Sequence, residues 1–274
     1  MINTIRKYYG YKFPRMGKTI FNMFIKLFPS SVKIDLFPSI SFVMNLNDLT
    51  QRSTFWQGER FEYPTAKVLR EYSQGKCKIF FDIGSNYGFY SYFVYSFYDN
   101  VNCYAFEPNP TTFHLMERII MENKLSRIKC YPLGLGDKRC KLCLHPGIED
   151  SGHSTFIEHP ELYKKSVGEV QIVTFDEWRK ENKIVIPIIP EWMVKIDVEG
   201  YELNVLKGME ESLVKKAFML LSVEINPFTL NLNNTYPNDI YKYLKRFNYR
   251  PLNSENLKSK YGNLKTDNVF FIPF

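Results

Sequence analysis

The sequence predicts an α/β fold in which helices cover both faces of a doubly wound, mostly parallel sheet. From Ile34 onward, short apolar runs alternate with segments whose apolar residues recur at helical spacing, as in strand–helix–strand units. The longest apolar runs have the length of strands, and none reaches the ~18–20 residues of a membrane-spanning helix. Several runs end in turns that carry an acidic residue. Because ligands bind at the carboxyl ends of strands in such sheets, these turns are where a functional site is expected.

The elements can be assigned in order along the chain. Residues 40–46 alternate loosely between apolar and polar and predict a strand, and residues 62–72 predict a helix. The apolar run 78–83 predicts a buried strand, which is followed by a helix at 90–97 and a strand at 101–106. Further strands are expected at 128–133, 193–198, 218–225 and 269–272, and further helices at 202–209 and 240–247.

One more helix start is marked by the pair Asn109-Pro110. Asparagine is a preferred N-cap, and proline suits the first helical position because its missing N–H has no partner there in any case. Phe113, Met116 and Ile119 then recur at helical spacing. A helix with this buried stripe is expected to follow the strand at 101–106.

Length and charge limit the possible organisation and partners. The chain has 274 residues, which fits one large domain or one domain with a small appendage. Of its net charge of +7, all comes from residues 1–34, which hold seven basic residues and no acidic one. The remainder is balanced, so its composition does not indicate nucleic-acid binding. We therefore expect a basic, aromatic N-terminal extension over residues 1–35 and one folded domain, large enough to be an enzyme, over residues 36–274.

The extension has two interpretations. Phe21, Phe24 and Phe28 fall at helical spacing among lysines and arginines. The favoured interpretation is a helix that packs its apolar face on the domain; the alternative is peripheral contact of residues 1–30 with an anionic membrane. The five cysteines are an odd number, which suits reduced thiols and a cytoplasmic location. No cleavable signal peptide is expected from the charged N-terminus.

The turn after residues 78–83 reads Asp82-Ile83-Gly84-Ser85-Asn86-Tyr87-Gly88. Glycines let a backbone approach a ligand, and the start of the following helix offers free N–H groups. The dinucleotide pattern G-x-G-x-x-G lacks its middle glycine here. An acid two residues before the first glycine instead suits a ligand with an amino group, such as the methionine end of S-adenosylmethionine. Glu107, after the next strand, is placed to accept both hydroxyls of a ribose.

A second group of acids lies farther along the chain. Lys195, Asp197 and Glu199 should share one face at the end of a strand, because side chains alternate. Glu224, near the end of the next strand, is expected beside them. Such a cluster could supply a general base or hold a divalent cation. The alternative is an ion pair between Lys195 and Asp197, with Glu199 in solvent.

Together these segments resemble the FkbM family of S-adenosylmethionine-dependent methyltransferases. The matching pieces are FFDIGSNYGFYS (80–91), AFEPNP (105–110), LGLGD (133–137), VTFDEW (173–178), KIDVEGYELNVLKGM (195–209) and SVEIN (222–226). Upstream, FWQGERFE (55–62) is also similar, so the resemblance covers roughly residues 38–274. Ser85 stands where the family usually has alanine.

The resemblance implies a class I, Rossmann-like methyltransferase fold with a seven-stranded sheet whose last strand is antiparallel. It implies that the cofactor is held by the residues Asp82, Gly84, Asn86, Gly88, Ser91, Glu107 and Asp137. Of these, Glu107 would take the ribose and Asp137 the adenine. Family members of known activity mostly methylate hydroxyl groups, often on sugars of glycans or glycosylated metabolites.

The mechanism that follows is in-line transfer of the methyl group to a sugar hydroxyl, with a carboxylate accepting the proton. The candidate bases are Glu199, which is preferred, Asp197 and Glu224. Mg²⁺ bridging these acids and the acceptor is a further hypothesis. The alternatives are a lipid, polyketide or peptide acceptor, or a non-catalytic membrane-surface protein with a methyltransferase-like body.

Two other groups of residues each have a functional and a structural interpretation. Cys140, Cys143 and His145 invite a metal or redox interpretation, but a strand would turn the two cysteines to opposite sides. His153 lies in a Gly/Ser-containing loop and could act as a base or bind substrate. The favoured interpretation of His153 is a histidine exposed to solvent.

Overall fold

The computed structural model describes residues 29–38, 40–73, 75–148, 150–159, 161, 163–252 and 268–274. The predicted helix of the N-terminal extension lies outside these residues. The strands are β1 (Ser31–Phe37), β2 (Ile40–Asn45), β3 (Ile79–Ile83), β4 (Asn102–Phe106), β5 (Ile128–Tyr131), β6 (Gly134–Leu135), β7 (Cys140–Cys143), β8 (Glu169–Val173), β9 (Trp192–Ile196), β10 (Phe218–Glu224), β11 (Tyr249–Pro251) and β12 (Asn268–Pro273). The helices are α3 (Leu49–Gln57), the 3-10 turn η3 (Gly58–Arg60), α4 (Tyr63–Ser73), α5 (Phe89–Phe97), α6 (Pro110–Glu122), α7 (Phe175–Glu181), α8 (Glu202–Lys207), α9 (Glu210–Val214), α10 (Pro227–Leu232) and α11 (Pro237–Arg246).

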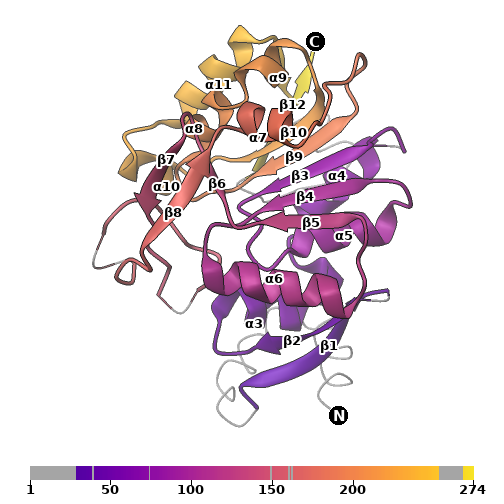
Figure 1. The fold of residues 1–274 in the computed structure, drawn as a ribbon, viewed down its shortest axis with the longest axis vertical. Coiled ribbons are helices and arrows are strands. Elements are labelled where there is room, and N and C mark those ends of the chain that lie inside the picture. Colours follow the sequence, from indigo (N-terminus) through magenta and orange to yellow (C-terminus); the bar gives the residue numbers. More distant parts are fainter. Residues whose placement is uncertain are drawn as a thin grey trace.

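The central sheet has seven strands in the order β11-β12-β10-β9-β3-β4-β5 (Figure 1). β3 lies in the middle and pairs in parallel with β4 and β9, while β12 runs antiparallel to both β10 and β11. The order of the strands reverses at β3, so the turn after this strand lies at the topological switch point. This is the seven-stranded, Rossmann-like sheet with an antiparallel last strand that the family resemblance implied.

Two hydrophobic cores fill the two faces of this sheet. Phe80 of β3 packs in the core under α4, α5 and α6, whereas its neighbour Phe81 packs in the core under α7, α8, α9 and α11. The alternation follows from the strand geometry, which turns successive side chains to opposite faces. It also fixes the face of Asp82, whose side chain lies on the same side as Phe80 and therefore under α5.

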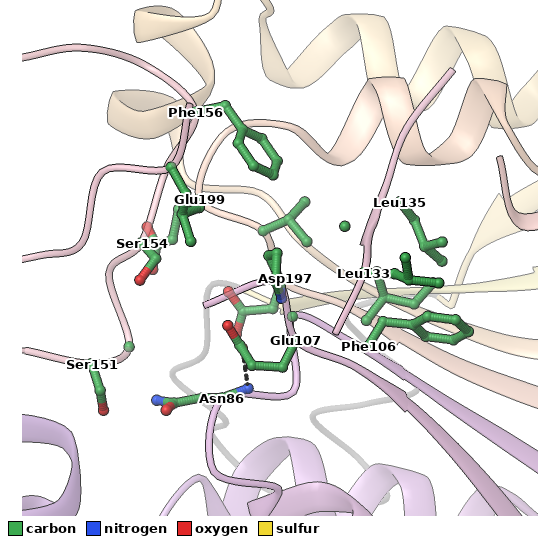
Figure 2. A pocket seen from close by; sticks show the side chains of 17 residues that line it. Asn86, Phe106, Glu107, Leu133, Leu135, Ser151, Ser154, Phe156, Asp197 and Glu199 are labelled. Carbon is green, nitrogen blue, oxygen red and sulfur yellow. Dashed lines mark hydrogen bonds between the residues drawn. The ribbon is translucent and has the colours of Figure 1, made fainter. Parts of the chain in front are cut away.

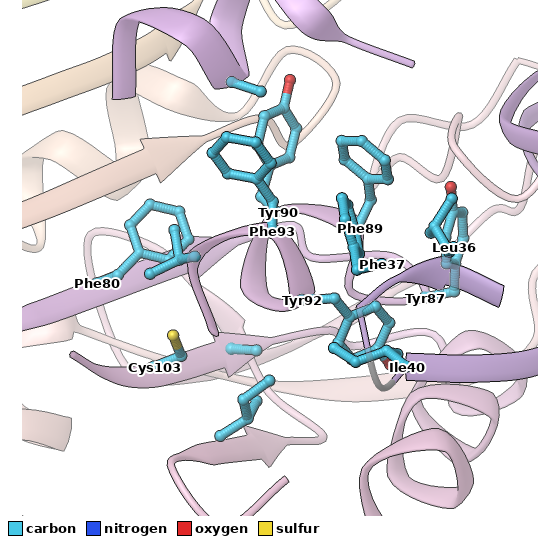
Figure 3. Packing of buried hydrophobic residues seen from close by; sticks show 14 of the residues in the cluster. Leu36, Phe37, Ile40, Phe80, Tyr87, Phe89, Tyr90, Tyr92, Phe93 and Cys103 are labelled. Carbon is cyan, nitrogen blue, oxygen red and sulfur yellow. The ribbon is translucent and has the colours of Figure 1, made fainter. Parts of the chain in front are cut away.

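An antiparallel hairpin, β1–β2, and helix α3 cover the outer side of α5 and α6 (Figure 1). Phe37 of the hairpin lies with its ring centroid 5.4 Å from that of Phe89 at the start of α5. Figure 3 shows Leu36, Phe37 and Ile40 directed at the aromatic side chains of α5. The hairpin thereby belongs to the same core as β3. The predicted domain boundary at residue 35 falls within β1.

A small sheet in the order β6-β8-β7 follows β5. The strand expected at Cys140–Cys143 is present as β7. All five cysteines of the protein have free thiols. The predicted strand at 128–133 ends earlier, at Tyr131, and the strand at 193–198 ends at Ile196. Among the described residues, no helix is long and apolar enough to cross a membrane.

Candidate active site

The carboxyl ends of β3, β4, β9 and β10 meet at one edge of the sheet, and the segments predicted to be functional lie there. Two cavities open at this edge. They share the lining residues Gly84, Asn86, Gly152, Asp197 and Glu199. The site is therefore one continuous region with two compartments that meet beside Asp197 and Glu199.

Glycines make the turn after β3 possible. Gly84 has a φ of +75°, and a Cβ atom there would lie only 1.8 Å from the backbone oxygen of Asp197. Gly88 is the N-cap of α5, with a φ of +97°, and a Cβ atom there would lie 2.8 Å from the side chains of Met116 and Tyr92. Both positions exclude a side chain because neighbouring elements pack against the turn. Gly84 thus allows the turn to approach the backbone of Asp197 closely, and it also lines both cavities.

Asp82 and Ser91 lie beneath the cavities. Asp82 is fully buried, and its Oδ2 accepts hydrogen bonds from the backbone N–H and the hydroxyl of Ser91 at 3.0 and 2.7 Å. Burial raises the pKa of this carboxyl, and the nearby Lys195 opposes the rise. Neither Asp82 nor Ser91 lines either cavity. Their visible role is to fix the start of α5 against β3.

Glu107 lines the first cavity but not the second, whereas Asp197 and Glu199 line both. Glu107 follows β4 and is buried, with 6% of its surface exposed. Its Oε2 accepts from the N–H of Asn86 at 2.7 Å (Figure 2). Its Oε1 accepts from the N–H of Asn109 at 2.8 Å. Burial raises its pKa to about 7. The hydroxyl of Thr112 also interacts with this carboxyl, and the acceptor capacity that is left can serve a ligand.

The first cavity, which we call the β4-side cavity, is small and two-sided, with a volume of about 40 Å³. Figure 2 shows apolar side chains of Phe106, Leu133 and Leu135 on one side and polar side chains of Asn86 and Ser151 on the other. The segment from Ser151 to Phe156 lies over it. Asp137, predicted as an adenine contact, is exposed and lies outside the lining.

The predicted carboxylate cluster is present. Asp197, Glu199 and Glu224 each offer a carboxylate oxygen, and these oxygens lie within 4.8 Å of one another. The reason differs from the one expected, because β9 ends at Ile196 and strand alternation stops there. Glu199 instead has a φ of +51°, in a turn that folds its side chain back to the cluster. Only 6% of Glu199 is exposed, so the alternative of a solvated Glu199 is wrong.

The predicted ion pair is also present. Lys195 Nζ lies 2.7 Å from Asp197 Oδ2 and 4.6 Å from the ring centroid of Tyr90. Lys195 thereby neutralises Asp197 directly. Burial and the charge of Asp197 raise the pKa of Glu199 to about 8, and burial raises that of Glu224 well above its usual value. The cluster therefore holds a proton near neutral pH, as carboxylates that share a buried site do.

Glu202 is a site residue that the sequence analysis missed. It is 1% exposed, and its Oε1 accepts hydrogen bonds from the N–H groups of Val198 and Gly200 at 3.0 and 3.2 Å. These two N–H groups flank Glu199, so Glu202 holds the turn in which Glu199 lies. Burial raises the pKa of Glu202 to about 7. A capping acid at the first position of α8 was the available signal.

His153 has carboxylates on both sides. Its Nδ1 lies 3.1 Å from Asp150 Oδ2, and its Nε2 lies 3.7 Å from Glu199 Oε1. The hydrogen bond to Asp150 raises the pKa of His153 to about 9, and Glu199 adds to this effect. The side chain is 58% exposed, as the favoured interpretation held, but it faces the site. The spacing of three residues between Asp150 and His153 brings their side chains together only in a loop that turns back on itself, and the sequence does not show such a turn.

The loop that carries His153 is attached to α3. The hydroxyl of Thr50 donates to Asp150, and the N–H of Ser151 donates to Asp48 at 2.8 Å. Asp48 also caps α3 by accepting from the N–H of Gln51. The loop is thereby anchored at one side of the site.

The second cavity, which we call the α3-side cavity, has a volume of about 270 Å³. Polar and aromatic side chains line it, and among them are Glu62, Phe61, Phe89 and Tyr90. The hydroxyl of Tyr90 donates to Glu62 at 3.2 Å. The α3-side cavity has room for a small ligand unit, just below the ~300–1,000 Å³ of sites for drug-sized molecules.

The strand order and the switch-point site define a class I methyltransferase-type fold, and a comparison with protein families identifies the family. A model of the methyltransferase FkbM domain matches residues 82–251, more than half of the chain. The chain belongs to the FkbM methyltransferase family.

Curated relatives are similar over part of their length. The hexuronic acid methyltransferase AglP of Haloferax volcanii is 28% identical, over 60% of this chain and 63% of the relative. The methyltransferase sdnD of Sordaria araneosa is 29% identical, over 47% of this chain and 60% of the relative. The chain thus spans about three fifths of the length of these relatives.

Solved structures show more distant likeness. A SAM-dependent methyltransferase from Aquifex aeolicus is 11% identical, with a TM-score of 0.41 over 77% of this chain and 89% of that one. TYW2 of M. jannaschii in complex with AdoMet is 11% identical, with a TM-score of 0.38 over 90% of this chain and 88% of that one. The fold assignment rests on the strand order of this chain.

Proposed function

We propose that the protein transfers a methyl group from S-adenosylmethionine to a hydroxyl group of a sugar. The observation that carries the proposal is the meeting of two cavities at Asp197 and Glu199. The β4-side cavity receives the cofactor and the α3-side cavity receives the acceptor. A donor in one and an acceptor in the other would meet beside carboxylates that can take up a proton.

The lining of the β4-side cavity suits the cofactor. Glu107 offers free lone pairs for the two ribose hydroxyls, and Phe106, Leu133 and Leu135 offer an apolar surface for a flat base. At about 40 Å³, the cavity is far smaller than the ~300–1,000 Å³ of typical ligand sites. Binding therefore requires the segment from Ser151 to Phe156 to move outward.

The remaining predicted cofactor residues act differently in the proposal. Asn86 contributes its backbone and side chain to both cavities. Gly84, Gly88, Asp82 and Ser91 shape the turn beneath the cofactor. The lining gives Asp137 no contact in this conformation.

Glu199 is the proposed base. S-adenosylmethionine, when bound, supplies an activated methyl group. Glu199 lines both cavities, and because its pKa is raised to about 8, the carboxylate form that accepts the hydroxyl proton becomes more populated as pH rises above 7. As the hydroxyl oxygen bonds to the methyl carbon, the bond from that carbon to the cofactor sulfur would break and S-adenosylhomocysteine would be the leaving group. Glu199 would take the hydroxyl proton and hold it until solvent removes it. Asp197 and Glu224 stay as alternative bases, because they share the cluster.

The sugar acceptor is supported by a relative and by the cavity. AglP, by its name, acts on a hexuronic acid. In this chain, Phe61, Phe89 and Tyr90 line the α3-side cavity beside carboxylates. Aromatic faces pack on apolar ring faces, and carboxylates accept from hydroxyls. Lipid, polyketide or peptide acceptors remain alternatives.

Mg²⁺ stays a hypothesis within this proposal. The three clustered carboxylates are the hard oxygen ligands that this ion prefers, but Lys195 already neutralises Asp197. Loss of turnover with a chelator, restored by Mg²⁺, would support a metal; full turnover would remove it.

The division into an N-terminal extension (residues 1–35) and a methyltransferase domain (residues 36–274) also stays a proposal. β1 begins at Ser31 and packs in the domain core. Deletion of residues 1–30 should therefore leave a cooperatively folded protein. Loss of vesicle binding on this deletion would support membrane contact, and an unfolded product would support a packed helix.

Thermal unfolding with S-adenosylhomocysteine tests the cofactor, and NAD⁺ is the comparison ligand. At 100 times its Kd, a ligand that binds only the folded protein adds about 2.7 kcal/mol. We expect a rise in Tm of several degrees with S-adenosylhomocysteine alone.

Glu107→Ala should weaken the binding of S-adenosylhomocysteine by ~1–3 kcal/mol, and Glu107→Gln, which keeps one acceptor oxygen, should weaken it by less. No shift in the wild-type protein would move the proposal to the non-catalytic alternative.

A further inference from the structure

The α3-side cavity carries an excess of acidic side chains. Its lining includes five carboxylates, namely Glu62, Asp150, Asp197, Glu199 and Glu224. It includes two basic side chains, Lys195 and His153, and no arginine or further lysine is among the described residues that line it. An acceptor that enters this cavity therefore meets mainly negative or proton-sharing groups.

Both basic side chains are already used by carboxylates. Lys195 is 3% exposed, and its ammonium lies between Asp197 and the face of Tyr90. His153 has Asp150 on one ring nitrogen and Glu199 near the other. An acidic acceptor would find no basic side chain without taking it from one of these carboxylates. Like charge in a partly buried site is costly, because the effective dielectric is low.

Two buried carboxylate oxygens in the cluster lack a hydrogen-bond donor. Oε2 of Glu199 and Oε2 of Glu224 accept no hydrogen bond from the described residues. A buried acceptor without a donor costs about 1–3 kcal/mol, and more when it is charged. Both oxygens are buried, so a ligand that brings donors gains that free energy when the two side chains turn these oxygens toward the cavity. A hydroxyl brings one donor, whereas an ammonium group brings three and a positive charge.

We propose that the acceptor is a sugar with a free, positively charged amino group close to the hydroxyl that is methylated. The amino group binds the unpartnered oxygens of Glu199 and Glu224, and the ring packs on the aromatic lining of the same cavity. This inference rests on the proposed function. It differs from the acceptor that the name of AglP states, since a hexuronic acid would bring a negative charge to this cluster.

The test compares three probes of equal ring size: methyl glucosaminide, methyl glucoside and methyl glucuronide. We measure turnover with S-adenosylmethionine by mass and position of the added methyl group. We measure binding separately, by calorimetry in the presence of S-adenosylhomocysteine. The expected order in both is amine, then neutral sugar, then acid, with at least tenfold between amine and neutral sugar. A neutral or acidic probe that equals the amine, or no binding by any probe, overturns the proposal.

The outcomes separate this proposal from the proposed function. Binding in the expected order without any turnover supports the amine and overturns the transfer. A methyl group found on nitrogen leaves amine binding in place and overturns the hydroxyl as nucleophile.

A matched pair of variants tests the charge itself. Glu62 lines the cavity and Glu122 is exposed on α6, outside it. Glu62→Gln should reduce the preference for the amine over the neutral sugar several-fold, and Glu122→Gln should leave it unchanged. An unchanged preference in Glu62→Gln, with the fold intact, counts against recognition by charge.

Discussion

Replacing Glu202 by alanine tests whether a buried acid holds the turn of the proposed base. Glu202 Oε1 accepts from the N–H groups of Val198 and Gly200, on either side of Glu199. Alanine leaves both donors without this partner. Each buried unpaired donor costs about 1–3 kcal/mol, so the gross loss in the free energy of unfolding is about 2–6 kcal/mol.

The loss should depend on pH. Burial raises the pKa of Glu202 from 4.5 to about 7. The folded protein therefore binds this proton more tightly than the unfolded chain, and the wild type loses up to about 3 kcal/mol as pH rises through this range. Alanine removes that loss along with the hydrogen bonds. We expect Glu202→Ala to lower the free energy of unfolding by about 2–5 kcal/mol at pH 5. At pH 8 the difference from the wild type should be about 2 kcal/mol smaller.

Urea unfolding at the two pH values measures this, with turnover as the second readout. Glu202→Gln is the matched control, because its amide oxygen can accept the same hydrogen bonds without the carboxyl titration. Turnover should fall in Glu202→Ala more than the affinity for S-adenosylhomocysteine. An alanine variant within 0.5 kcal/mol of wild type at pH 5, with normal turnover, would refute the role of Glu202.

Three further predictions follow from the same edge of the sheet. Gly84→Ala should cost several kcal/mol in the free energy of unfolding, because its Cβ would overlap a carbonyl oxygen; Gly75→Ala, with a φ of +77° but open space, should cost only ~1–2 kcal/mol. Glu199→Gln should lower turnover at least tenfold and leave S-adenosylhomocysteine binding within twofold; full turnover would move the base to another group. Stability should fall from pH 5 to 9, since burial raises the pKa of Glu107 to about 7 and of Glu199 to about 8, so that the folded state releases these protons later than the unfolded chain. A free energy of unfolding that rises over this range would contradict these pKa directions.

Local signals in the sequence were sufficient for most of the sheet. Asn109 caps α6 as expected, accepting from the N–H of Thr111, because capping depends on neighbours in the chain. Apolar runs gave the strands to within two or three residues. The helix α3 and strand β1 were not assigned, since α3 has buried polar residues such as Gln51 and no clear apolar stripe.

The chemistry of the site was harder to predict. The closeness of Asp197, Glu199 and Glu224 followed from parallel strands, but the turn that brings Glu199 inward did not. Asp82 stays a predicted cofactor residue, and its hydrogen bond with Ser91 joins a strand position and a helix position that the sequence did not pair. Pairing of His153 with Asp150 and Glu199 joins a loop to a distant strand end, and sequence spacing carries no such information.

The loop held to α3 by Thr50 and Asp48 has a kinetic consequence. Its Gly152 lines both cavities, and its segment from Ser151 to Phe156 closes the one assigned to the cofactor. An acceptor seated against His153 would hold that segment down. Substrates should then bind in a compulsory order, with S-adenosylmethionine first and the acceptor second. S-adenosylhomocysteine should leave last. Product inhibition would reveal this as competition between S-adenosylhomocysteine and S-adenosylmethionine alone.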